Sequence, residues 1–228
     1  MKAKWGAIVV DGRGKIGGHV ASKNRSGSYF RTKVSPVNPQ TSFQTAVRAI
    51  FTMLSQAWRS LTTAQIAAWN ASVDNFKGTN VFGDIKTPSG MNVFMRLNQN
   101  ILNVGGSQIN TPPTNLASPD GTPITATGDV SSTALEVAWT SGAVPAGTVR
   151  IVEATPPISP GVSFVKNQFR VIANVAAAAT SPQNVWADYI AKYGTPAAGQ
   201  KIIVRIKDVT LATGLTSPYY YAELIVTA

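Results

Sequence analysis

Residues 41–61 read TSFQTAVRAIFTMLSQAWRSL, and this stretch decides the architecture of the first half of the chain. Thr41 and Gln44 form the T-x-x-Q pattern of a capping box, which predicts that a helix begins directly after Thr41. The apolar residues that follow recur at the spacing of a single helical face. They are Phe43, Val47, Ile50, Phe51, Leu54, Trp58 and Leu61. The sequence therefore predicts a helix over about 42–60 that buries this one face and leaves the rest in solvent.

Two further helices are predicted downstream, each from its own start signal. Thr62 and Gln65 make a second capping box before an apolar-periodic run, so a second helix is expected over about 63–77. A third helix is expected over about 88–104, because a cap residue precedes Pro88 and proline suits the first helical position. The link between the first two helices is very short, which predicts a helical hairpin.

The residues before these helices alternate short β-rich runs with glycine. Strands are expected over Trp5–Val10, His19–Lys23 and Ser28–Val34, separated by glycine-rich turns. A hairpin of this size is not stable alone and needs a surface to pack on or pair with. Residues 1–36 are therefore interpreted as a β arm that is a candidate for docking onto a partner.

The positive charge of the chain is confined to its first half. The 228 residues carry 20 Lys and Arg against 10 Asp and Glu, a formal net charge of +10. Residues 1–105 hold thirteen of the bases and three of the acids, which accounts for the whole imbalance. This asymmetry predicts that the N-terminal part meets something acidic, either nucleic acid or an acidic protein surface. A basic face that is merely solvated is the remaining alternative.

A second domain is expected after a segment rich in Pro, Gly, Ser and Thr. Residues 107–123 contain almost nothing apolar, so they are interpreted as a linker between a basic anchoring module over 1–106 and a domain over 124–228. That domain alternates strands with Pro/Gly turns, which predicts an antiparallel β-sandwich and an α+β fold class for the whole chain. The expected elements are strands over Ala134–Thr140, Val149–Ala154, Val162–Ala173, Lys201–Val209 and Tyr219–Thr227, and a short helical insertion over about 182–193.

One of these expected strands carries a prediction about burial. Within Lys201–Val209, side chains at alternate positions point to the same face of the sheet. Ile202, Val204 and Ile206 share a face with Asp208. The three aliphatic side chains are expected to be buried and Asp208 to be exposed.

The chain offers little material for catalysis. It has no Cys, a single histidine at His19, and only 13% charged residues, whereas acid–base catalysis draws mostly on His, Asp, Glu, Lys and Tyr. A two-histidine metal site or a Ser–His nucleophile cannot be assembled from this set. No window approaches the roughly 20 apolar residues of a membrane span. We therefore predict no catalytic, cofactor-binding or metal-binding residues, no enzyme activity and no membrane partner.

The pattern Gly12-x-Gly14-x-x-Gly17 matches a dinucleotide-binding fingerprint by its letters. Such a site needs a helix that begins at the glycine loop, so that the helix N-terminus meets the pyrophosphate, and an acid about 20 residues further on. Here residues 19–24 are β-like and residues 31–37 contain no acid. The three glycines are therefore interpreted as turn residues.

A set of residues in the first module resembles a known family. The positions are Gly14-Lys15-Ile16-Gly17-Gly18, Tyr29-Phe30-Arg31, Pro36-x-Asn38-Pro39-x-Thr41-x-x-Gln44, Arg48, Phe51, Trp58-x-x-Leu61-Thr62, Gln65 and Trp69. Over roughly residues 12–70 this set is similar to an N-terminal module of tailed-bacteriophage virion proteins, including those of crAss-like phages. In that family a Gly-rich arm and an N-P-x-T-x-x-Q helical hairpin precede Ig-like β domains. The resemblance implies a virion role without enzyme activity.

The C-terminal domain is similar to Ig or fibronectin type III (FN3) sandwiches in its series of short strands separated by Pro/Gly turns and in Trp139. It lacks the Cys pair of antibody domains, and the helical insertion departs from a minimal seven-strand pattern. The resemblance therefore implies an Ig/FN3-like sandwich with an added helix.

The chain is expected to be a non-enzymatic structural protein of a phage virion that is assembled in the host cytoplasm. In this interpretation it is an auxiliary or decoration protein, present in multiple copies, that docks on the major capsid protein or other virion proteins and displays its sandwich. The alternatives are a tail or head–tail connector component, and a DNA-binding protein that uses the same basic arm. The expected anchor residues are Arg13, Lys15, Lys23, Arg25, Tyr29, Arg31 and Lys33.

Overall fold

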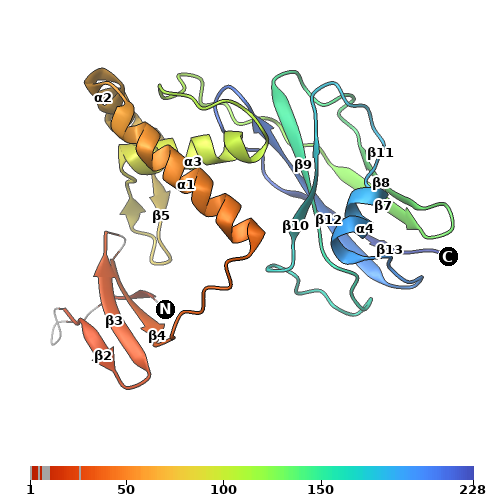
Figure 1. Cartoon of the computed structure of the whole chain (residues 1–228), viewed down its shortest axis with the longest axis horizontal. Helices are drawn as coiled ribbons and strands as arrows, with labels where there is room; N and C mark the ends of the chain where they lie inside the picture. The colour runs from red at the N-terminus through yellow and green to blue at the C-terminus, as the bar shows by residue number, and fades with distance from the viewer. Residues whose placement is uncertain (1, 5, 7–10, 26) are drawn as a thin grey trace. The chain divides into compact units, whose positions relative to one another are not determined.

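Helices and antiparallel sheets both contribute to the fold (Figure 1). The computed structural model describes residues 2–4, 6, 11–25 and 27–228. The chain divides into two units, Met1–Phe94 and Met95–Ala228, and the boundary falls inside the third α-helix. The predicted combination of helices with antiparallel sheets is confirmed.

The N-terminal unit begins with a small antiparallel sheet in the order β1-β4-β3-β2. The predicted strands His19–Lys23 and Ser28–Val34 correspond to β3 and β4, whereas Trp5–Val10 lies outside the described residues except for Gly6. Gly17 has φ +55° in the turn between β2 and β3, a conformation that residues with a side chain rarely adopt. The strands are β1 (Lys2–Ala3), β2 (Gly14–Ile16), β3 (His19–Asn24) and β4 (Gly27–Thr32).

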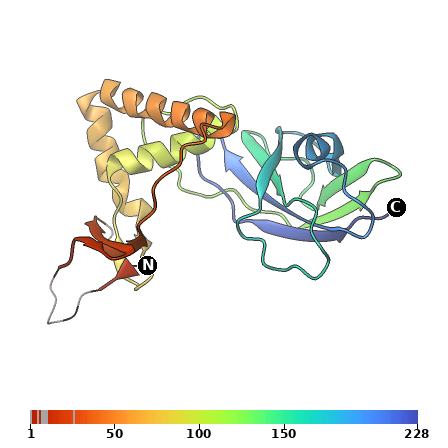
Figure 2. The ribbon, with the colours of Figure 1, turned by 60° about the horizontal axis from the view of Figure 1, so that its bottom comes forward.

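An extended segment, which we call the strap (residues 33–41), connects this sheet to the first helix. It can be followed in Figures 1 and 2, and every one of its residues is exposed. Pro36 and Pro39 each lack a backbone N–H and hold φ near −65°, which favours an extended chain over a helix for the residues before them. The strap is thus a spacer with no side chain in a core.

Local capping determines where the first two helices begin. α1 (Ser42–Ser60) starts where Gln44 N donates to Thr41 Oγ1 at 3.3 Å. α2 (Thr63–Ala71) starts with a complete capping box, in which Gln65 N donates to Thr62 Oγ1 at 3.3 Å and Thr62 N donates to Gln65 Oε1 at 2.9 Å. The predicted box at Thr41 is only half formed, because Gln44 Oε1 is buried without a partner. A 3-10 helix, η1 (Ser72–Phe76), continues α2 to the predicted end.

The third helix, α3 (Gly90–Asn103), starts later than predicted. Its cap is Ser89 rather than the residue before Pro88, because Asn92 N donates to Ser89 Oγ at 3.3 Å. A glycine is required at the first position, since a Cβ on Gly90 would lie 2.9 Å from the backbone nitrogen of Asn70. The Ser89 cap thus sets the start of α3, and close approach to α2 restricts its first residue to glycine.

The core of the N-terminal unit is small and aromatic. The ring centroid of Phe94 lies 5.4 Å from that of Trp58 and 5.4 Å from that of Trp69. Trp69, Phe94 and Leu54 are each 0% exposed, whereas Trp58 is only half-buried. Pairs of rings tilted or edge-on at such distances are the favourable arrangement for aromatic side chains. The C-terminal half of α1 is therefore the part that packs.

Two antiparallel sheets make up most of the C-terminal unit, with strand orders β10-β9-β12-β13 and β11-β8-β7. Their strands are β7 (Ile124–Asp129), β8 (Ala134–Trp139), β9 (Thr148–Ala154), β10 (Arg170–Val175), β11 (Gln183–Asn184), β12 (Lys201–Thr210) and β13 (Tyr220–Ile225). The predicted strand Val162–Ala173 is wrong over most of its length, because only its last four residues belong to β10. Val165 and Phe169 pack from a loop onto Ile203 and so cover the sheet instead of extending it.

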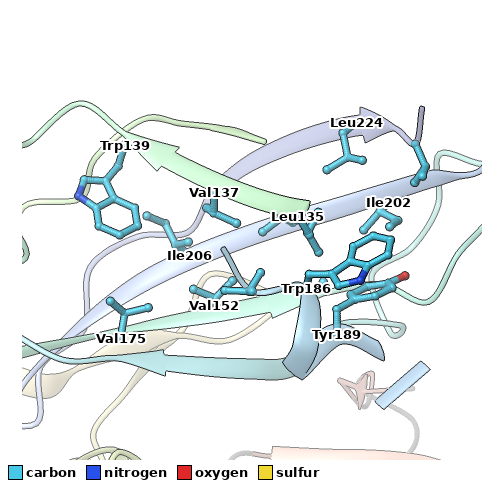
Figure 3. Close-up of a cluster of buried hydrophobic side chains, with 14 of the residues drawn as sticks. Leu135, Val137, Trp139, Val152, Val175, Trp186, Tyr189, Ile202, Ile206 and Leu224 are labelled. Carbon is cyan, nitrogen blue, oxygen red and sulfur yellow. The ribbon is translucent and has the colours of Figure 1, made fainter. Parts of the chain in front are cut away.

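Both sheets contribute to one hydrophobic core, shown in Figure 3. Leu135 and Val137 of β8 and Ile202 of β12 are each 0% exposed. α4 (Trp186–Tyr193) contacts β10 of one sheet and β8 of the other, with Trp186 and Tyr189 buried. The predicted helical insertion is confirmed, although it begins at Trp186 rather than near residue 182.

The predicted exposure of Asp208 is wrong. Its side chain is buried with the rest of its face, because the guanidinium of Arg150 on β9 reaches across to it. The register places Asp208 directly opposite Arg150 on the neighbouring strand. A buried carboxylate is tolerated only with such a partner.

Residues 107–123 contain no helix or strand. Asn98, a buried residue of α3, donates to Ile109 O at 3.1 Å and accepts from Ile109 N at 2.7 Å. These bonds fasten the start of the segment to α3, and Thr122 near its end is buried. Its role as a linker stays a prediction.

Candidate docking surface of the N-terminal unit

The acids of the N-terminal unit are all engaged in ion pairs. Residues 1–94 hold twelve Lys and Arg and three Asp, a formal charge of +9. The pairs are Asp11 with Arg13 at 3.4 Å, Asp74 with Lys77 at 3.0 Å, and Asp84 with Lys4 at 2.9 Å. The surplus positive charge is therefore not neutralised within the unit.

Five of the predicted anchor cations have no acid partner among the described residues. They are Lys15, Lys23, Arg25, Arg31 and Lys33, and all are exposed. Arg13 is also exposed but pairs with Asp11. Exposed cations keep their full hydration and full charge, so they are free to meet an acidic partner at little desolvation cost.

Only some of the predicted anchor residues share a face of the sheet. The register aligns Lys15, Val20 and Arg31 in one row across β2, β3 and β4. Neighbouring strands are about 4.8 Å apart, so the two cations stand about 10 Å from each other on that face. Tyr29 lies two residues before Arg31 on the same face and is half-buried. Alternation places Lys23 on the opposite face.

The remaining anchor cations lie outside the paired strands. Arg13 precedes β2, Arg25 lies in the turn between β3 and β4, and Lys33 begins the strap. The predicted set is thus distributed over both faces and the ends of the sheet, and it does not form one pocket. A broad electrostatic contact suits this layout better than a small ligand does.

The apolar face of α1 does not have the predicted burial. Leu54 is 0% exposed, but Phe43 is 69% and Phe51 56% exposed, and Val47 is exposed as well. The prediction of a buried face is correct for the second half of α1 and wrong for the first half. The second half of α1 includes Trp58, whose ring packs on Phe94, whereas Phe43, Val47 and Phe51 in the first half are exposed.

Apolar side chains are also exposed on a short hairpin of the same unit. β5 (Gly78–Thr79) and β6 (Ile85–Lys86) flank a loop in which Val81 is exposed, and Ile85 of β6 is exposed too. Asn80 organises this loop through hydrogen bonds to its own neighbours, including Phe82 N at 2.8 Å and Asp84 N at 2.9 Å. The side-chain hydrogen bond from Lys4 holds the pKa of Asp84 below its ordinary value.

Exposed large apolar side chains are concentrated in the N-terminal unit. Ten of the sixteen found in the described part of the chain belong to residues 1–94, although this unit is the smaller of the two. Single exposed apolar residues are ordinary, but a concentration of them marks an interaction surface. We call these ten residues, together with the five unpaired cations, the candidate docking residues; they are distributed over the β sheet, the strap, α1 and the β5–β6 hairpin. The apolar members are Ile16, Val34, Val37, Phe43, Val47, Phe51, Met53, Val81, Phe82 and Ile85.

The glycine pattern at Gly12, Gly14 and Gly17 is not followed by a helix. Gly14 opens β2, Gly17 lies in the turn, and the strand β3 follows. Without a helix N-terminus at the loop, a pyrophosphate has no cradle of backbone N–H groups. The interpretation as turn glycines is confirmed for Gly17, whereas Gly14 is a strand residue and Gly12 lies in the segment before β2.

No catalytic constellation is found in the described ranges. His19 is exposed on β3, and no cluster of three His, Cys, Asp or Glu that could hold a metal ion occurs among those residues. Within the same ranges no helix has the length and apolar character needed to cross a membrane.

A pocket of about 530 Å³ lies beside β7 and β13, and its polar side chains stabilise the local turn. It is lined by Asp129, Glu136 and Thr227 among others. Asp129 Oδ1 already accepts hydrogen bonds at 2.8 Å from both the backbone N–H and the hydroxyl of Ser131, which lower the pKa of this carboxyl. These bonds hold the turn after β7 rather than a reacting group.

A second polar cluster, on the outer face of the larger sheet, is also internally satisfied. The guanidinium carbon of Arg205 lies 4.1 Å from the ring centroid of Phe169 and 4.0 Å from that of Tyr219. Its Nε donates to Glu153 Oε2 at 2.6 Å. Tyr221 is 56% exposed on the same face. Sequence reasoning missed this cluster, because its members come from four segments distant in sequence.

No protein-family model matches the chain, and no curated protein matches it in sequence. Among solved structures, the crystal structure of a Fn3-like protein from Clostridium thermocellum is similar to it, with 17% identical residues and a TM-score of 0.28. The match covers 49% of this chain and 94% of that one. At this TM-score and identity, we conclude nothing about the fold or function of the chain from the match.

Proposed function

We propose that the chain is a non-enzymatic structural protein of a tailed-bacteriophage virion, an auxiliary or decoration protein that attaches through its N-terminal unit. The resemblance of residues 12–70 to virion proteins motivates the proposal. In it, α1 and α2 form the helical hairpin of the anchoring module, and the C-terminal unit is an Ig/FN3-like sandwich displayed at the particle surface.

The observation that carries the proposal is that charge and unburied apolar surface coincide in one unit. Residues 1–94 hold +9 of the +10 formal charge, and they also hold most of the exposed large apolar side chains. A surface that is both basic and apolar suits an acidic protein partner, because each kind of group gains from association. Repetition of such a site on a virion lattice strengthens weak contacts between adjacent copies.

The C-terminal unit supports the proposal because it has almost no net charge and a well-packed core. It carries eight Lys and Arg against seven Asp and Glu, a formal charge of +1, and its core is continuous between two sheets. A well-packed, nearly neutral unit in the same chain as a strongly basic one fits a division of the chain between display and attachment.

The proposal is tested first by composition and stoichiometry of purified particles. Mass spectrometry of particles from a phage that encodes the chain should detect it, with hundreds of copies if it covers the shell and about a dozen if it belongs to the portal or tail. Absence of the chain from particles would overturn the proposal.

Charge reversal then tests the attachment. Arg31→Glu and Lys15→Glu should each reduce the number of copies per particle, because both cations are exposed and unpaired on one face of the sheet. Lys166→Glu is the matched control, since Lys166 is an exposed lysine of the C-terminal unit. Equal incorporation of all three variants would argue against attachment through the arm.

DNA binding by the same unpaired cations is the competing interpretation. A mobility-shift assay with random duplex DNA at physiological salt separates the two. In the virion proposal, binding is weak and capsids compete for the protein. If capsids do not compete and the logarithm of DNA affinity falls linearly with the logarithm of salt concentration, DNA is the partner.

A further inference from the structure

We infer that the first half of α1 is a docking face for an acidic amphipathic helix of the partner protein. The face is formed by Phe43, Val47, Ile50 and Phe51, and we call it the α1 face. This inference names the partner chemistry of the N-terminal unit and so rests on the proposed function.

The α1 face is an apolar surface that the described residues leave uncovered. Phe43 is 69%, Val47 37% and Phe51 56% exposed, and Ile50 is half-buried. One turn further along the same helix, Leu54 is fully buried. The change from exposed to buried along one stripe shows that α1 extends beyond the unit's own core.

The spacing of the stripe favours a helix as the occupant. Phe43, Val47, Ile50 and Leu54 follow one another at steps of 4, 3 and 4 residues. This alternation keeps side chains on a line along which two helices pack with interlocking side chains. A β-strand or a flat surface has no matching repeat, whereas an amphipathic helix presents anchors at the same intervals.

The charges around the α1 face favour an acidic occupant. α1 and α2 contain Arg48 and Arg59 but no acid. The guanidinium of Arg48 donates to the amide oxygen of Asn38 at 2.9 Å, a neutral partner that leaves its charge unbalanced. A second copy of the chain would bring another +9 unit to the contact and would be repelled. An occupant with carboxylates beside its apolar stripe is attracted instead.

Synthetic peptides test the inference on the full-length protein. Three fluorescent peptides of about 20 residues are compared, a length of roughly 30 Å as a helix. The first carries a leucine stripe with a glutamate-rich polar face, the second the same stripe with lysine in place of glutamate, and the third the first composition scrambled so that no stripe remains. Binding is measured by fluorescence anisotropy, with sedimentation of the protein alone to detect self-association.

The expected result is selective binding of the striped acidic peptide. Phe43→Ser combined with Phe51→Ser should weaken it by about tenfold or more, since exposed aromatic anchors dominate such interfaces. Phe164→Ser is the matched control, because Phe164 is a 78% exposed phenylalanine of the C-terminal unit. The substituted side chains are exposed, so urea unfolding should be nearly unchanged in all variants.

Four results of the peptide comparison would overturn the inference. They are equal binding of the lysine peptide, equal binding of the scrambled peptide, the same loss of binding with Phe164→Ser, and no loss of binding with the Phe43/Phe51 variant.

Two other results would assign the α1 face to a different occupant. Self-association of the protein that the Phe43/Phe51 variant abolishes would assign it to a second copy of the chain. Sedimentation with vesicles of equimolar phosphatidylcholine and phosphatidylserine that depends on the two phenylalanines would assign it to a membrane. Absence of the chain from particles would overturn the proposed function without changing the peptide result.

Discussion

Arg150 and Asp208 form a two-point ion pair inside the C-terminal unit. Arg150 Nε and Nη2 donate to Asp208 Oδ1 and Oδ2, both at 2.7 Å, and the two side chains are 1% and 2% exposed. The guanidinium also stacks over Trp139, 4.6 Å from the ring centroid. The two strands β9 and β12 are thereby joined by a charged contact within an otherwise apolar region.

Removing one member of this pair should be strongly destabilising. Asp208→Ala leaves a buried guanidinium without its counter-charge, and breaking a buried pair in this way costs about 3–5 kcal/mol. Urea unfolding at neutral pH measures the loss. Asp74→Ala is the control, because Asp74 pairs with Lys77 at the surface, where the change should stay within about 0.5 kcal/mol. A similar decrease in the free energy of unfolding in both variants would show that the buried Arg150–Asp208 pair stabilises the fold no more than the surface pair does.

The two tryptophans beside Phe94 should differ in their contribution to stability. Trp69 is 0% exposed, so Trp69→Ala should cost about 3–5 kcal/mol through lost burial and a residual cavity. Trp58→Ala should cost clearly less, because Trp58 is only half-buried. Urea unfolding followed by circular dichroism gives both values. A larger loss for Trp58 would contradict the packing described for α1.

Gly214 should be intolerant of a side chain for two separate reasons. Its φ is +70°, and a Cβ there would lie 2.8 Å from the carbonyl carbon of Leu97. Gly147→Ala is the matched control, because Gly147 has φ +71° with open space around it. The control should lose about 1 kcal/mol from backbone strain alone, and Gly214→Ala should lose more. Equal melting temperatures would show that the approach to Leu97 is easily relaxed.

The stability of the C-terminal unit should fall at alkaline pH. Burial raises the pKa of Tyr189 well above its usual range, while the unfolded chain ionises this group near pH 10. The unfolded state therefore loses its proton first, and the free energy of unfolding decreases as pH rises above about 10.

Tyr189→Phe isolates this effect. The variant should lose about 1 kcal/mol at neutral pH, because the hydrogen bond from Tyr189 Oη to Thr155 O at 3.1 Å is removed. Its further loss between about pH 9 and about pH 11 should be smaller than that of the unsubstituted protein. Urea midpoints across this range provide the measurement. Parallel curves for the two proteins would mean that Tyr189 does not titrate with unfolding.

Local signals in the sequence predicted local structure well. The starts of α1 and α2 follow from hydroxyl groups that cap backbone N–H groups within three residues, so Thr41 and Thr62 were sufficient to locate them. The start of α3 was placed two residues too early, because Thr87 and Ser89 are both residues that can cap a helix, and the structure shows that Ser89 Oγ accepts from the N–H three residues further on. Two cap candidates so close together cannot be ranked from the sequence pattern alone.

Periodicity predicted which residues share a face but not what covers that face. It placed Phe43 and Leu54 on one stripe of α1, and only the second of them is buried. It placed Asp208 on the buried face of β12, and the assumption that a carboxylate must be exposed then gave the wrong result. The compensating Arg150 lies 58 positions earlier, so no local pattern reveals the pair. The cations predicted as anchors are exposed, and their role as anchors stays a prediction; their division between two faces of the sheet required the strand register.

In the proposed attachment, the strap between β4 and α1 would make binding by the N-terminal unit bivalent. Pro36 and Pro39 stiffen its nine residues, while Gln40, with φ +47°, interrupts the extended backbone just before α1. Once either the β arm or the α1 face is bound, the strap holds the other at a high effective local concentration near the partner. Shortening or lengthening the strap would therefore change avidity while leaving each individual contact intact.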